Sequence, residues 1–345
     1  LSNLGIRLWE LERPDEALSV TEEAVTIRRE LAALHPDRYQ PHLAESLHNL
    51  GVHLSELGRP AEALSVEQEA VTIRRELAEL YPNRYRPDLA TSLSNLGIRL
   101  WELERPDEAL SVTEEAVTIR RELAELHPDR YQPHLATSLS NLGNRLSELE
   151  RPDEALSVTE EAVTIDRKLA ELHPHRYRPH LAGSLHNLGV RLSELGRLDE
   201  ALPAEQEATA IYRELVELYP DRYRPDLASS LNSLSLHLSE LGRLDKALSA
   251  AQESVAIYRE LFELYPDRYR FSLARSLSAL STYLSDLGLL AEEIPVLKEF
   301  LTLSWKLAEL HPDRYPPNIG SLLAESMRQI EEAEAHEEAQ QTGDN

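Results

Sequence analysis

An internal repeat of 46 residues is the feature that most limits what this chain can fold into. An Arg-Tyr pair keeps the same phase seven times, so seven units account for residues 1–322 of the 345. The tripeptide Asn-Leu-Gly begins, without any insertion between copies, at Asn3, Asn49, Asn95, Asn141 and Asn187. Units repeated at this period are expected to stack in a line, each packing only against its neighbours.

Each unit predicts two helices. In the first half of the second unit, leucines recur at steps of four, three, four and three, which is the spacing of one helix face and not of a strand. Pro41 is expected to start this helix and Gly58 to close it in the left-handed conformation. Pro60 then opens the second helix, and Pro82 ends it. No strand pattern occurs, so the predicted fold class is all-α, a solenoid of antiparallel helix pairs.

Two departures from the repeat bear on helix geometry. The turn glycine is replaced by Glu12, Glu104 and Glu150 in three units, so those helix ends must close without the conformational freedom of glycine. Pro203 and Pro295 fall inside second helices. Because proline removes a backbone hydrogen bond, we expect these two helices to be bent or shortened.

The two ends of the chain differ from the regular units. The sequence begins inside the first helix of the first unit, so this helix is truncated at its N-terminus and we expect the chain to be part of a longer protein. Residues 317–339 are predicted to form a C-terminal capping helix. The polar and acidic residues 340–345 are predicted to be a disordered tail.

The charge balance bears on the class of partner. There are 61 Asp and Glu residues against 36 Lys and Arg, for a net charge of -25, and this acidity argues against nucleic-acid binding. No apolar run approaches the roughly 18 residues of a membrane span, and no secretory signal is visible. We therefore expect a cytoplasmic protein that binds neither nucleic acid nor membrane. Its partner should carry basic or mixed charge.

The matching positions in each unit resemble the tetratricopeptide repeat (TPR), in the longer-period form seen in kinesin light chains. In the second unit, the residues that carry this resemblance are Leu50-Gly51, Gly58, Glu62-Ala63-Leu64, Ala70 and Pro82. The resemblance implies a right-handed superhelix whose first helices line a concave groove. It also implies that the groove binds a protein or peptide segment.

Three rows of polar residues form the candidate peptide-binding groove. Residues spaced i, i+4 and i+7 on the first helices share one face. The amide row is Asn49, Asn95, Asn141 and Asn187; the basic row is His53, Arg99, Arg145, Arg191 and His237; the acidic row is Glu56, Glu102, Glu148, Glu194 and Glu240. The resemblance implies that the asparagines hold a peptide backbone. The alternative is that each arginine pairs with the glutamate three residues later, as a solvated helix face.

Two neighbouring rows are candidates for setting specificity. One is mostly small or polar and includes His48 and Ser94, and the other is mostly apolar and includes Val52, Ile98 and Leu236. The apolar row either offers side-chain pockets or packs against the next helix, and packing is the favoured interpretation.

No catalytic, metal or cofactor motif is recognisable, since G-x-S-x-G, H-E-x-x-H and glycine-rich phosphate loops do not occur. The predicted function is a non-catalytic protein- or peptide-binding scaffold or sensor module of a larger protein. One alternative is a structural solenoid whose molecules associate end to end. Another is the sensor domain of an upstream NTPase or effector enzyme.

Overall fold

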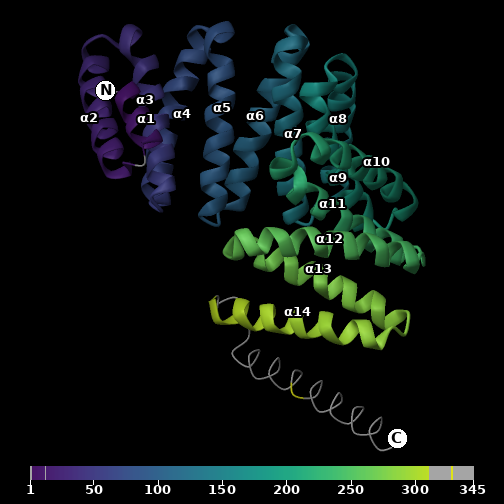
Figure 1. Cartoon of the computed structure of the whole chain (residues 1–345). Helices are drawn as coiled ribbons and strands as arrows, with labels where there is room; N and C mark the ends of the chain where they lie inside the picture. Colours follow the sequence, from purple (N-terminus) through teal and green to yellow (C-terminus); the bar gives the residue numbers. More distant parts are fainter. Residues whose placement is uncertain (1, 12, 311–327, 329–345) are drawn as a thin grey trace, which may run out of the picture. The chain divides into compact units, whose positions relative to one another are not determined.

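Helices alone make up the described part of the chain, which in this computed structural model comprises residues 2–11, 13–310 and 328 (Figure 1). The first helices of the units are α1 (Ser2–Glu10), α3 (Pro36–Glu56), α5 (Pro82–Glu102), α7 (Pro128–Glu148), α9 (Pro174–Glu194), α11 (Pro220–Glu240) and α13 (Pro266–Asp286). The second helices are α2 (Pro14–Leu34), α4 (Pro60–Leu80), α6 (Pro106–Leu126), α8 (Pro152–Leu172), α10 (Leu198–Leu218), α12 (Leu244–Leu264) and α14 (Leu290–Leu310). Consecutive helices form antiparallel pairs, which confirms the predicted all-α solenoid.

The two connections in the repeat have very different lengths. A turn of three residues joins the helices of one unit, and a single residue joins α4 to α5. That residue is Tyr81, which has φ -137° and ψ 67° and precedes Pro82. A residue before proline is disfavoured in the helical region because the proline ring clashes with it. The X-Pro step therefore ends one helix and starts the next at the same place.

This junction corrects the predicted start of the first helices. Helix α3 begins at Pro36, and Pro41 lies inside it as its sixth residue. The Arg-Tyr pair is accordingly part of the first helical turns and not of a loop. In the next unit Tyr85 is buried, and the guanidinium of Arg84 lies 5.1 Å from the centre of its ring. Both prolines of a unit are compatible with a helix start, and the chain uses the earlier one.

Pro203 and Pro295, which were predicted to bend or shorten their helices, do not shorten them. Helices α10 and α14 span 21 residues, like every other helix except the nine-residue α1. Each proline is the sixth residue of its helix and is exposed. Only the single hydrogen bond to the first helical turn is lost there, so the rest of the helix continues.

In the turn inside each repeat unit, two backbone N–H groups that follow the first helix donate hydrogen bonds to carbonyls near its C-terminal end. After α3, the Arg59 N–H donates to the Leu54 carbonyl at 2.8 Å and the Gly58 N–H to that of Ser55 at 2.9 Å, with φ 70° at Gly58. This is a Schellman arrangement, in which one residue must be left-handed. Glu104 and Glu150 occupy the same position with φ 55° and 56°. The predicted closure without glycine is therefore confirmed for these two turns, at the expense of backbone strain.

We expect Glu150→Gly to raise the free energy of unfolding by about 1 kcal/mol, because the left-handed conformation costs an L-residue roughly that much. Urea unfolding followed by circular dichroism measures the change. Glu150→Ala is the matched control, since it removes the same side chain but keeps the Cβ atom, and it should give little of the gain. An equal gain from both variants would contradict the strain explanation.

The described helices fall into two compact bodies, residues 1–169 and 170–345, each of which contains several repeat units. In the first, helices α1 to α7 contact each other in chain order, and in the second, helices α9 to α14 do so. Each of the two compact bodies has its own apolar core. The same repeat position supplies the most deeply buried leucines of the first core, namely Leu47, Leu93 and Leu139, all with no exposed surface.

Glycine allows the helices of one unit to approach closely. A Cβ atom on Gly143 of α7 would lie 2.7 Å from Thr159 Oγ1 and 3.4 Å from the Ala155 carbonyl oxygen of α8. Gly97 of α5 meets Thr113 of α6 in the same way. At both places a residue without a side chain therefore marks the closest contact between the two helices.

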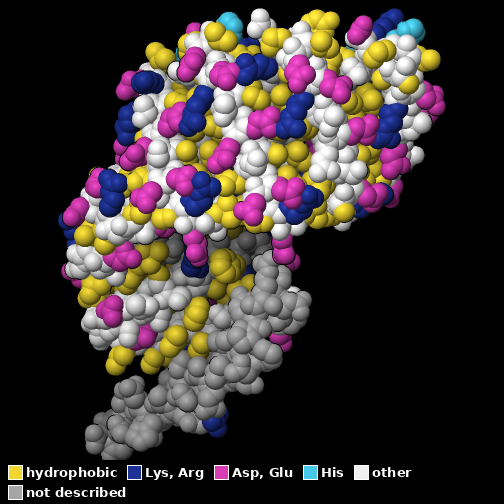
Figure 2. All heavy atoms as spheres, turned by 180° about the vertical axis from the view of Figure 1, so that it is seen from behind, with side chains coloured by type: hydrophobic (Ala, Val, Ile, Leu, Met, Phe, Trp, Pro, Cys, Tyr) yellow, Lys and Arg dark blue, Asp and Glu magenta, His cyan; other side chains and the backbone are white. Residues whose placement is uncertain are grey.

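Ion pairs join the second helices of successive units. In each pair an arginine reaches a glutamate 40 residues later, with shortest distances of 2.5 to 2.6 Å in four of them. These four pairs are Arg75–Glu115, Arg121–Glu161, Arg213–Glu253 and Arg259–Glu299. Figure 2 shows basic and acidic side chains set beside each other repeatedly on one face of the molecule. Because these ion pairs are largely accessible to solvent, each contributes little to stability.

Two remaining features concern the ends of the chain and the bilayer. The predicted capping helix (317–339) and tail (340–345) lie outside the described residues, except for Arg328. Within the described part, no helix combines the length and the apolar character that crossing a membrane requires.

Candidate functional site

The candidate groove residues lie on the first helices, as predicted, but their exposure differs along the rows. Asn141 is exposed, and Asn49, Asn95 and Asn187 are partly exposed. All five glutamates of the acidic row are exposed near the C-terminal ends of their helices. The amide and acidic rows are therefore accessible to a partner.

The arginines of the basic row pair within their own helices. Their Nη1 atoms lie 2.7 to 3.0 Å from the carboxylate three residues later, in the pairs Arg99–Glu102, Arg145–Glu148 and Arg191–Glu194. The pairing alternative is thus confirmed for these three arginines. The carboxylates of all three pairs remain exposed.

The two histidines of the basic row are not on the open surface. His53 is 5% exposed, stacks on Trp9 at 4.5 Å between ring centres, and has Nδ1 3.3 Å from Thr21 Oγ1. His237 is 3% exposed. Burial lowers the pKa of both imidazoles, although nearby glutamates act in the opposite direction. The lowered pKa favours the neutral form of both imidazoles, and their burial removes both from the accessible part of the basic row.

A cavity of about 340 Å³ opens among α5, α6 and α7. It brings together three predicted site residues, Asn141, Arg145 and Glu148. The other lining residues are Ser94, Gly97 and Ile98 of α5, Thr113 of α6, and Ser138 and Asn144 of α7. The cavity thus places an amide, an ion pair and hydroxyl groups around one recess on the first-helix surface.

Trp101 and the apolar row lie next to the three candidate rows on the first helices. Trp101 supports the cavity wall, because the Arg145 guanidinium lies 4.3 Å from the centre of its ring. Such cation–π contact restricts the arginine side chain. Packing was the favoured interpretation of the apolar row, and it is wrong for Ile98 and Leu236, which remain 37% and 43% exposed.

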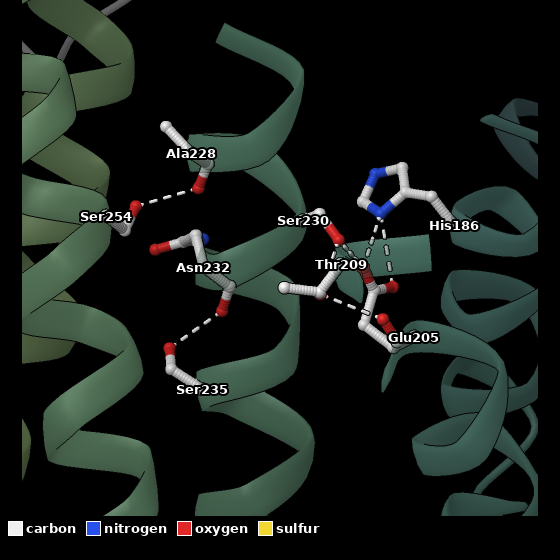
Figure 3. Close-up of polar contacts among 8 residues, drawn as sticks. All are labelled: His186, Glu205, Thr209, Ala228, Ser230, Asn232, Ser235 and Ser254. Atoms are coloured by element: carbon white, nitrogen blue, oxygen red, sulfur yellow. Dashed lines mark hydrogen bonds and ion pairs between the residues drawn. The ribbon is translucent and has the colours of Figure 1, made fainter. Parts of the chain in front are cut away.

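Two buried histidine–glutamate pairs were not anticipated from the sequence. His48 Nδ1 lies 3.1 Å from Glu67 Oε1, and His186 Nδ1 lies 2.9 Å from Glu205 Oε1. The glutamates are 1% and 0% exposed. Figure 3 shows that the Glu205 carboxylate also faces Ser230, whose hydroxyl donates to Oε1 at 2.6 Å. Buried carboxylates need such partners, since an unpaired one is strongly destabilising.

These pairs could have been found in the sequence, because the residue types at the two positions change together from one repeat to another. Where one unit has histidine and glutamate, others have serine and threonine at both positions together. The matched pairs are His48 with Glu67, Ser94 with Thr113, Ser140 with Thr159 and His186 with Glu205. Residues that change together across copies are expected to be in contact.

Sequence comparison places the chain in a family. Two tetratricopeptide repeat profiles match it, one over residues 1–76 and the other over residues 89–129, 135–174, 181–221 and 227–267. The matched segments cover more than half of the chain. This chain is a tetratricopeptide repeat protein. No curated protein sequence matches this TPR chain.

Solved structures share the TPR fold. BtubC (BKLC) from P. vanneervenii is 21% identical, with a TM-score of 0.57 over 72% of this chain and 92% of that chain. A putative kinesin light chain from P. anserina, with nearly identical TPR-like repeats, is 20% identical, with a TM-score of 0.51 over 65% and 98%. The apo form of RapI is 14% identical, with a TM-score of 0.53 over 85% and 97%. The predicted resemblance to kinesin light chain-like repeats is confirmed at the level of fold.

Proposed function

We propose that this TPR protein is a non-catalytic scaffold or sensor module that binds an extended protein segment along its first helices. The observation that carries the proposal is the cavity among α5, α6 and α7. Asn141, Arg145 and Glu148 come from the three predicted rows, and all three line this recess. A recess with convergent polar groups is the usual form of a recognition site.

The amide row supports capture of a peptide backbone. An asparagine side chain carries both a donor and an acceptor, so it can bond the C=O and N–H of an extended segment. Asn95, Asn141 and Asn187 recur at the repeat spacing and retain accessible surface. Backbone contacts of this kind would supply affinity that depends little on the partner's sequence.

Charge supports a partner with basic or mixed composition. The net charge is -25, and the carboxylates of the acidic row stand exposed beside the amide row. Complementary charge accelerates encounter and disfavours acidic competitors. The same field argues against nucleic acid as the ligand, because phosphates would be repelled.

A display library of random decapeptides provides a test that needs no known partner. We expect the native protein to select binders, and Asn95→Ala, Asn141→Ala and Asn187→Ala together to weaken them about 10-fold or more, as expected when several backbone hydrogen bonds are lost. Asn83→Ala is the matched control, since Asn83 is exposed in the first turn of α5. Undiminished binding by the triple variant, or no selected peptide at all, would refute the proposal.

A further inference from the structure

The cavity beside α5 exists because two side chains are small. In the preceding unit the matching positions hold His48 and Glu67, which contact each other and fill the space between the helices. At the cavity these positions hold Ser94 and Thr113. We therefore attribute the recess to the smaller side chains at these two positions of an equivalent pair of helices.

The hydroxyl groups of this cavity have already used their protons. Ser94 Oγ donates to the Ala90 carbonyl at 3.0 Å, and Thr113 Oγ1 donates to the Ala109 carbonyl at 2.7 Å. Each hydroxyl has one proton and two acceptor lone pairs. The oxygens of Ser94 and Thr113 consequently present acceptors to the cavity, and an occupant must bring the donors.

The walls add a negative charge and an apolar strip. The carboxylate of Glu148 keeps half of its side-chain surface exposed, although it pairs with Arg145 at 3.0 Å. Arg145 also lines the cavity, with its guanidinium 4.3 Å from the centre of the Trp101 ring. Ile98, 37% exposed, supplies an apolar surface along which a methylene chain can lie.

We propose that this cavity receives a lysine side chain of the bound segment. The proposal rests on the proposed peptide-binding function and names the chemistry of one position in the ligand. A lysine has an apolar stem that suits Ile98 and an ammonium group with three donors for separately placed acceptors. The cavity volume of about 340 Å³ is large enough to admit a lysine side chain.

Other side chains fit this chemistry less well. An apolar side chain would leave the oxygens of Ser94 and Thr113 desolvated without a donor, and a carboxylate would place its own acceptors beside these two oxygens and the negative charge of Glu148. The planar guanidinium of an arginine requires paired acceptors in one plane, whereas the oxygens of Ser94 and Thr113 belong to different helices. The overall negative charge of the protein further favours a cation.

The test measures binding of the display-selected peptides by fluorescence anisotropy, with each lysine of a peptide replaced in turn by norleucine, arginine or glutamine. We expect one lysine whose replacement by norleucine weakens binding about 10-fold, as the loss of a charged donor would. Thr113→Val keeps the shape and removes one acceptor. It should weaken the lysine peptide and leave the norleucine peptide unaffected.

A second variant closes the cavity with residues that this fold already accommodates. Ser94→His together with Thr113→Glu reproduces the pair found in α3 and α4, where the glutamate is 1% exposed beneath its histidine. We expect unchanged circular dichroism and loss of the preference for lysine over norleucine. If peptides bind in an asparagine-dependent way but show no lysine whose replacement matters, the lysine proposal fails while the proposed function stands. If the triple asparagine variant binds normally, the proposed function fails.

Discussion

Replacing Leu139 by alanine should lower the free energy of unfolding by about 3 kcal/mol, because it removes buried methyl groups and leaves a cavity. Leu139, in α7, has no exposed surface and belongs to the apolar core of the compact body formed by residues 1–169. Helix α7, which carries Leu139, packs against α6 of the preceding repeat. Closing the gap would therefore require movement of more than one helix pair. Urea unfolding followed by far-UV circular dichroism measures the loss.

Leu126→Ala is the matched control for this prediction. Leu126 ends α6 and is 65% exposed, so the same chemical change should alter stability by no more than about 0.5 kcal/mol. Similar losses from the two variants would show that Leu139 is not the buried residue that the repeat register makes it.

Gly143→Ala should destabilise the protein by about 2 kcal/mol, although alanine is the better helix former. The added Cβ atom would lie 2.7 Å from Thr159 Oγ1, so the two helices of the unit must separate or the threonine must abandon its bond to the Ala155 carbonyl. Overpacking of this kind costs about 1–3 kcal/mol. The melting temperature and the urea midpoint should both fall.

Gly183→Ala provides the opposite result from the same substitution. Gly183 is also helical, in α9, but its added Cβ would meet only Tyr212 Oη at 3.5 Å, an ordinary contact. Helix propensity should then stabilise the protein by up to about 1 kcal/mol. If Gly143→Ala were stabilising as well, the close approach of α7 and α8 would not constrain position 143.

The fold was largely predictable because it repeats a local pattern. Leucines at steps of three and four predict a helix from one segment alone, and the strict period carries the prediction to every copy. The start of the first helices was not predictable in the same way, because Pro36 and Pro41 both suit a helix start. The single-residue junction at His35 depends on how one helix pair packs on the next, which no single segment specifies.

The candidate site was predictable only where its residues share a helix. The pairing of Arg145 with Glu148 follows from their spacing alone. The burial of His53 depends on contact with Thr21, 32 residues earlier on another helix. The cavity likewise depends on the small size of both Ser94 and Thr113, which belong to different helices, so the periodicity of one helix carries no information about it.

The arginine–glutamate pairs between successive second helices have an evolutionary consequence. The boundaries between α4 and α6, α6 and α8, α10 and α12, and α12 and α14 each have an arginine on one side and a glutamate on the other. Excision or duplication of a 46-residue stretch at such a boundary recreates an equivalent one. Genes with near-identical tandem copies recombine readily, and here such an event would alter the number of repeats without demanding a compensating mutation. The length of this protein is therefore a quantity that selection can adjust in whole steps.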